Sequence, residues 1–109
     1  MVQQSLRERY GQLEWPQQLG NLASTLARIA TRADSPRYDA LTSDLLREAA
    51  LFVEWSAPHV PQSLLLDLSP LQRELLAWQR VWPLEDGRSL LALHARHASD
   101  HLLRLAQLV

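Results

Sequence analysis

Three histidines near the C-terminal end of the sequence form the pattern best suited to chemistry. His94, His97 and His101 are spaced i, i+3 and i+7, which a helix places within about 60° of one another on one face. Imidazoles so placed are ligands for Zn²⁺ or another divalent ion, and helical bundles build metal sites from facing side chains. A catalytic zinc site needs three protein ligands, however, and one helix seldom supplies three in good geometry.

The same spacing has a structural interpretation. On a helical wheel His94 and His101 border the apolar stripe of their helix, and His97 lies further toward water. Side chains with an apolar body and a polar tip are common at such a boundary without any function. We therefore expect no metal and no cofactor. A metal ion or a small ligand on the His94, His97 and His101 face is the alternative, and a pH-sensing or catalytic role of these histidines is a further one.

Glu48 is the second residue with a chemical interpretation. The wheel of its helix puts it on the rim of the apolar arc, between Leu41 and Trp55. A carboxylate there needs a partner, because a buried unpaired charge is costly. We expect either a salt bridge to an arginine of a neighbouring helix, such as Arg80 or Arg96, or simple exposure of the carboxylate. The second choice of partner is an imidazole of the histidine helix. The second choice would join Glu48 to a carboxylate–histidine site.

Other catalytic patterns are missing from the sequence. It has no cysteine, and its three glycines stand too far apart for a phosphate-binding or dinucleotide-binding loop. Ser99, Asp100 and His101 are neighbours in the chain, so on a helix their side chains fan out and form no relay. Enzyme activity is not expected.

Prolines and apolar spacing define the elements that must carry these residues. The apolar residues recur at helical spacing and predict helices over 16–33, 36–57, 62–82 and 88–107. Ser35 and Ser69 each precede a proline as a helix start signal, and Gln72 completes a capping box with Ser69.

The N-terminal segment, residues 1–14, has a weaker pattern. Val2, Leu6, Tyr10 and Leu13 predict a short amphipathic turn laid across the bundle, and Gly11 is expected to interrupt it.

The predicted fold is all-α, an antiparallel up-down four-helix bundle with a short N-terminal arm, in one domain over residues 1–109. Four amphipathic segments with short connections favour this arrangement. The predicted core comprises Leu22, Leu26, Leu45, Phe52, Leu71, Leu75, Leu102 and Leu105.

Composition supports a single globular domain. The chain has 109 residues, of which 47% are hydrophobic and 21% charged, and its net charge is −1. Acidic and basic residues are interspersed, so no basic stripe predicts nucleic-acid binding. The longest apolar run, 49–53, is too short to span a membrane, and Arg7, Glu8 and Arg9 stand where a signal peptide would be apolar. We expect a cytoplasmic protein.

Several large apolar residues lie off the predicted stripes. They are Leu51, Leu65, Leu66, Leu76, Val81, Leu93 and Leu103. If such residues cluster on the surface they predict an interface, and we take Leu51, Leu76, Val81, Leu93 and Leu103 as its candidates. The expected function is non-enzymatic protein–protein interaction or an adaptor role, with a homodimer or another protein as the partner. The rival explanation is that residues 1–14 and 58–68 cover these positions within one chain.

Two stretches carry a resemblance to known proteins. Residues 43–55, SDLLREAALFVEW, and residues 71–83, LQRELLAWQRVWP, resemble small helical proteins of cyanobacteria that have no assigned function. The similarity rests on helix-core patterns over most of the chain after Leu13. It implies an intracellular setting in a photosynthetic bacterium and supplies no catalytic residue.

Overall fold

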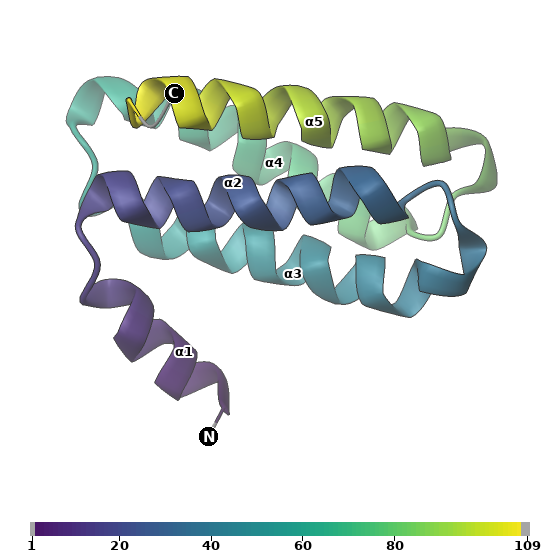
Figure 1. Cartoon of the computed structure of the whole chain (residues 1–109), viewed down its shortest axis with the longest axis horizontal. Helices are drawn as coiled ribbons and strands as arrows, with labels where there is room; N and C mark the ends of the chain where they lie inside the picture. Colours follow the sequence, from purple (N-terminus) through teal and green to yellow (C-terminus); the bar gives the residue numbers. More distant parts are fainter. Residues whose placement is uncertain (1, 108–109) are drawn as a thin grey trace.

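The computed structural model describes residues 2–107, and side chains from Ser5 to Gln107. The described chain is all-helical, as predicted, but it contains five α-helices rather than four. These are α1 (Val2–Gly11), α2 (Trp15–Arg32), α3 (Asp39–Ser56), α4 (Leu65–Val81) and α5 (Arg88–Leu105). Figure 1 shows α2 lying between α5 and α3, with α4 behind them and α1 turning away at one end. None of the described helices combines the length and the apolar character that a membrane crossing needs.

Helix α1 is the element that the sequence analysis underestimated. Residues 1–14 were expected to give only a short turn, yet Val2–Gly11 is a regular helix that contacts α3. Gly11 ends this helix instead of interrupting it. Leu6 and Leu13 pack against the core and Tyr10 is buried within it, so α1 uses the predicted apolar side. The side chain of Val2 lies outside the described residues.

The starts of α3 and α4 differ from prediction. Residues 36–38 and 62–64 each form a single 3₁₀ turn, and the α-helices begin at Asp39 and Leu65. The predicted capping box at Ser69 is wrong, because α4 continues through Pro70 and Ser69 lies inside the helix. An acidic residue in the first turn favours each of these starts, since a carboxylate complements the positive end of the helix dipole: Asp39 in α3 and Asp67 in α4.

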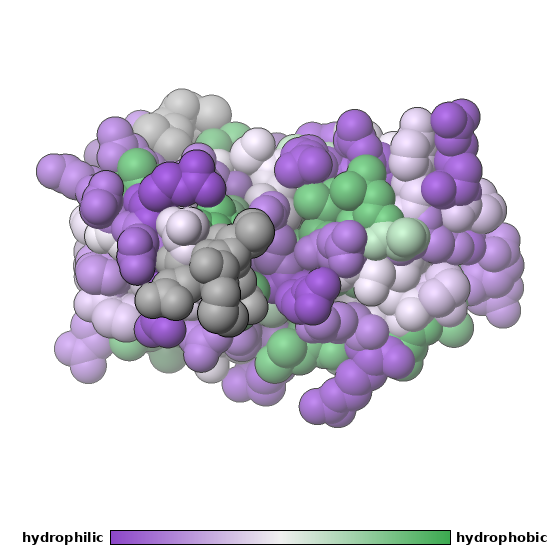
Figure 2. Space-filling view, turned by 90° about the horizontal axis from the view of Figure 1, so that it is seen from below, coloured by the Kyte–Doolittle hydropathy of each residue, from purple (hydrophilic) through white to green (hydrophobic). Residues whose placement is uncertain are grey.

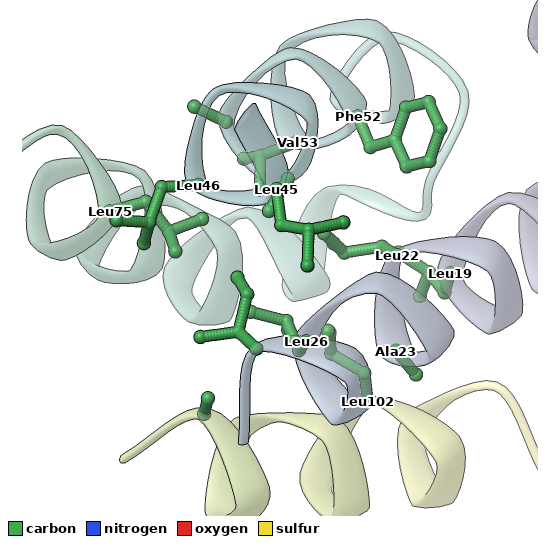
Figure 3. Packing of buried hydrophobic residues seen from close by; sticks show 14 of the residues in the cluster. Leu19, Leu22, Ala23, Leu26, Leu45, Leu46, Phe52, Val53, Leu75 and Leu102 are labelled. Atoms are coloured by element: carbon green, nitrogen blue, oxygen red, sulfur yellow. The ribbon is translucent and has the colours of Figure 1, made fainter. Parts of the chain in front are cut away.

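The core lies where α2 meets α5 and α3. These are the most extensive helix contacts, although α2 and α5 are far apart in the sequence. Of the predicted core residues, Leu22, Leu26, Leu45, Phe52, Leu75 and Leu102 are buried, whereas Leu71 and Leu105 are only half-buried. Figure 3 shows leucines of α2, α3, α4 and α5 converging on one another.

Candidate functional site

The histidine face lies along the line where α5 passes α4. His94 Nδ1 is 2.6 Å from Glu74 Oε1, and His101 Nε2 is 2.9 Å from Asp67 Oδ1. Both carboxylates belong to α4, so the two outer histidines bridge the helices. His97 lines the same open hollow of about 300 Å³ together with His94, His101 and Glu74. The predicted shared face is therefore formed.

The two histidine–carboxylate pairs follow a regular spacing in the sequence. Asp67 and Glu74 are seven residues apart on α4, and their partners His101 and His94 are seven apart on α5 in reverse order. Two helical turns separate the two carboxylates on α4, and two turns separate the two histidines on α5. A matched seven-residue spacing of acids on one helix and histidines on another is therefore a sequence signal for contact between α4 and α5.

The geometry of this face does not gather metal ligands. Among the described residues no group of three or more His, Asp or Glu side chains is close enough to hold a metal ion. The side chains of His94 and His101 remain 44% and 47% exposed. Exposed side-chain bridges contribute little to stability, about 0–1 kcal/mol each even when both partners are charged, because water screens them. The face is best described as two surface bridges between α4 and α5.

Glu48 lies on a different side of the molecule. Its carboxylate accepts a hydrogen bond from Thr25 Oγ1 of α2 at 2.9 Å. Within the described part of the chain it makes no salt bridge, so the expected partners Arg80 and Arg96, and the alternative imidazole, are all wrong. Thr25 is buried although its side chain is polar. The contact with α3 extends the buried face of α2 to include it.

A buried arginine at one end of the helices escaped the sequence analysis. Arg88 donates to both oxygens of Asp39 at 2.6 and 2.9 Å, to Glu85 at 2.9 Å and to the carbonyl of Ala33 at 3.2 Å. Its guanidinium also lies over the ring of Trp82. These bonds hold the pKa of Asp39 below its ordinary value. A cation in the first turn of a helix is unfavourable unless it is paired, so the position of Arg88 was itself a signal.

A second buried polar cluster fixes α1. Tyr10 Oη donates to the carbonyl of Gln18 at 2.7 Å and lies 2.5 Å from Ser56 Oγ, whose hydroxyl can donate to it. Gln18 Nε2 returns a bond to the carbonyl of Tyr10 at 3.0 Å. The Tyr10 ring stacks on Phe52 with the ring centres 4.3 Å apart. Burial raises the pKa of Tyr10 well above its ordinary value. The cluster is structural, because its polar atoms are enclosed by protein.

An open groove lies between α3 and α4. It has a volume of about 710 Å³, and its walls are mostly apolar. The side chains that line it are Val53, Glu54, Ala57, Leu65, Leu68, Ser69, Gln72, Arg73 and Leu76. Leu65 and Leu76 remain 37% and 39% exposed. The oxygen Oε1 of Gln72 is shut off from solvent and has no hydrogen-bond partner among the described residues.

The predicted interface residues separate into two groups. Leu76, Val81 and Leu93 are exposed, and only Leu76 lines the groove. Leu51 and Leu103 are half-buried and pack against the core, so they are poorly placed to meet another protein. Some of the large apolar residues that lie off the predicted stripes thus pack within the chain and are not available to a partner.

Comparisons with known proteins add no relative to this description. The chain matches no protein-family model, no curated protein and no solved structure. The resemblance to cyanobacterial helical proteins stays a prediction.

Proposed function

We propose that this chain acts by binding protein without catalysing a reaction, and that its partner is a second copy of itself. The groove between α3 and α4 is the observation that carries the proposal. In this proposal helices α2–α5 form the antiparallel up-down bundle that the sequence favours, and α1 packs on the outside of it. The groove between α3 and α4 lies on the outer surface of this bundle.

Exposed apolar residues alone would be a weak argument. Figure 2 shows the side of the molecule on which α3 and α1 lie, where hydrophobic side chains reach the surface in separate patches divided by polar ones. Scattered patches of this kind are normal on a folded protein. The groove differs because two exposed leucines, Leu65 and Leu76, stand on the wall of one concave apolar surface.

Self-association would bury these leucines. Removing one leucine side chain from water contributes on the order of 2 kcal/mol. In a two-fold dimer each leucine is used twice, but Leu65 and Leu76 are only 37% and 39% exposed in the single chain, so together they supply about 3 kcal/mol toward the cost of association. The immobilisation of two chains costs more than this, about 4–15 kcal/mol, so the other apolar side chains that line the groove must contribute as well. We therefore expect a weak dimer that forms at high micromolar to millimolar concentration.

Sedimentation equilibrium over concentrations from micromolar to millimolar tests the proposal. We expect the wild-type chain to approach twice the monomer mass as concentration rises. The double variant Leu76→Glu plus Leu93→Glu changes exposed positions on both α4 and α5, and it should remain monomeric with unchanged helical circular dichroism. A wild-type chain that keeps the monomer mass at every concentration would end the proposal of self-association.

A further inference from the structure

Four of the α4 residues that line the groove form a pattern that is the same from either end of the helix. Leu65, Ser69, Gln72 and Leu76 follow one another at spacings of four, three and four residues. Leucine stands at both ends and a hydroxyl or amide at both inner positions. The two leucines are eleven residues apart, which corresponds to about 16 Å along a helix. Such a pattern is complementary to its own copy when the copy runs in the opposite direction.

The groove also holds one free charge of each sign. Glu54 lies on the α3 wall and Arg73 on the α4 wall, and both side chains are exposed. Neither takes part in a salt bridge with another described residue. Arg73 makes only a long hydrogen bond of 3.4 Å to Ser69 Oγ of its own helix. An acid and a base on opposite walls are again self-complementary, because a two-fold axis brings each of them to the other wall.

We infer that a second copy of this chain docks in the groove about a two-fold axis that crosses α4 between Pro70 and Leu71. The inference rests on the proposed function and names its surface. In this arrangement Leu65 of one copy faces Leu76 of the other, and Ser69 faces Gln72. Arg73 of the second copy comes level with Leu68, beside the wall that carries Glu54. The interface is isologous, so every contact occurs twice.

One polar group of the free chain supports this arrangement. Gln72 Oε1 is buried without a hydrogen-bond partner among the described residues, and leaving such an atom unsatisfied is unfavourable. Turned toward the groove in the dimer, the Gln72 amide meets the Ser69 hydroxyl of the second copy, which can donate to it. The Gln72 side chain must rotate for this contact, because its Oε1 is enclosed in the single chain.

Charge reversal tests the geometry. In Glu54→Arg the two copies oppose arginine to arginine twice, and in Arg73→Glu they oppose glutamate to glutamate twice. We expect each variant alone to associate on the order of 100-fold more weakly than wild type at low salt, because facing like charges are unfavourable. An equimolar mixture of the two variants restores both opposite pairs and should form a heterodimer of nearly wild-type affinity. Arg96→Glu, an exposed reversal on α5 outside the groove, is the matched control and should dimerise like wild type.

The outcomes separate the two proposals. If wild type dimerises but the single reversals dimerise equally well, the groove is the wrong surface and self-association stands. If wild type is monomeric throughout, both proposals fail. Two monomeric variants that keep their helical circular dichroism but do not recover on mixing would contradict the pairing of Glu54 with Arg73. Single variants Leu76→Glu and Leu93→Glu give an independent readout, since only the first should weaken a dimer formed at the groove.

Discussion

Helix α1 should detach from the rest of the molecule when its buried tyrosine is removed. Tyr10→Ala deletes the ring that stacks on Phe52 and the hydroxyl that bonds to Gln18 and Ser56. Truncation of a buried aromatic side chain costs about 3–5 kcal/mol. The lost hydroxyl leaves the buried Ser56 without its partner, which adds roughly 1–3 kcal/mol.

The expected loss is thus about 4–8 kcal/mol, which is comparable to the whole stability of a marginal domain. It falls, however, on contacts that hold only α1. The cores between α2, α3 and α5 do not depend on these contacts. We expect α1 to unfold locally while α2–α5 stay folded. Tyr10→Phe keeps the ring and should cost only about 2 kcal/mol, with α1 still docked.

Native-state hydrogen exchange measures this difference. In Tyr10→Ala the amides of α1 should exchange at unprotected rates, and those of α2–α5 should keep most of their protection. Trp55, which is buried beside Tyr10, should show red-shifted fluorescence. A uniform loss of protection in all five helices would refute the reasoning, because it would show that α1 and the other helices unfold as one unit.

Two further predictions concern the end of the molecule near Arg88 and the glycines. A Cβ at Gly87 would lie 3.0 Å from atoms of Leu84 and Trp78, whereas one at Gly11 would meet nothing within 4 Å. We therefore expect Gly87→Ala to destabilise the fold by about 1–3 kcal/mol. The matched variant Gly11→Ala should stabilise α1 by about 0.5–1 kcal/mol. Urea unfolding measures both changes, and equal effects of the same sign would contradict this prediction. The lowered pKa of Asp39 means that its contribution to stability is fully present above pH 3.8, its ordinary value, and is lost as pH falls through the lowered value in the folded state. Asp39→Asn should accordingly lower the melting temperature at pH 7 and have little effect in strong acid; a difference that grows in acid would contradict the sign.

The buried residues of a helix with one dominant apolar stripe were predictable, because the apolar side of the helical wheel is the side that packs against the core. In α2 the residues Leu19, Leu22, Leu26 and Ile29 are fully buried, as their spacing indicates. Thr25 is buried as well, because α2 is covered on two sides, by α5 and α3, and a second neighbour widens the buried face beyond the apolar residues. A wheel of a single helix contains no information about how many neighbours it has.

Which side chains of two different helices contact each other was less predictable than which side of one helix they lie on. The histidines share a face, as their spacing requires, but their partners Glu74 and Asp67 depend on the rotation of α4 about its own axis. The same reason explains Glu48, whose partner is set by how α3 is turned against α2. The groove could not be predicted at all, because it results from the separation of α3 and α4 and not from either helix alone.

The large contact between α2 and α5 has a consequence for synthesis of the chain. Helix α2 ends at Arg32 and α5 begins at Arg88, so a long stretch of chain is made between them. Until α5 is made, α2 can pack against α3 but lacks the helix that covers its other apolar side. Nascent chains with exposed apolar surface are prone to aggregation and bind chaperones. Folding of this protein should therefore complete only once α5 has left the ribosome, and chains stalled before α5 should be recognised as unfolded.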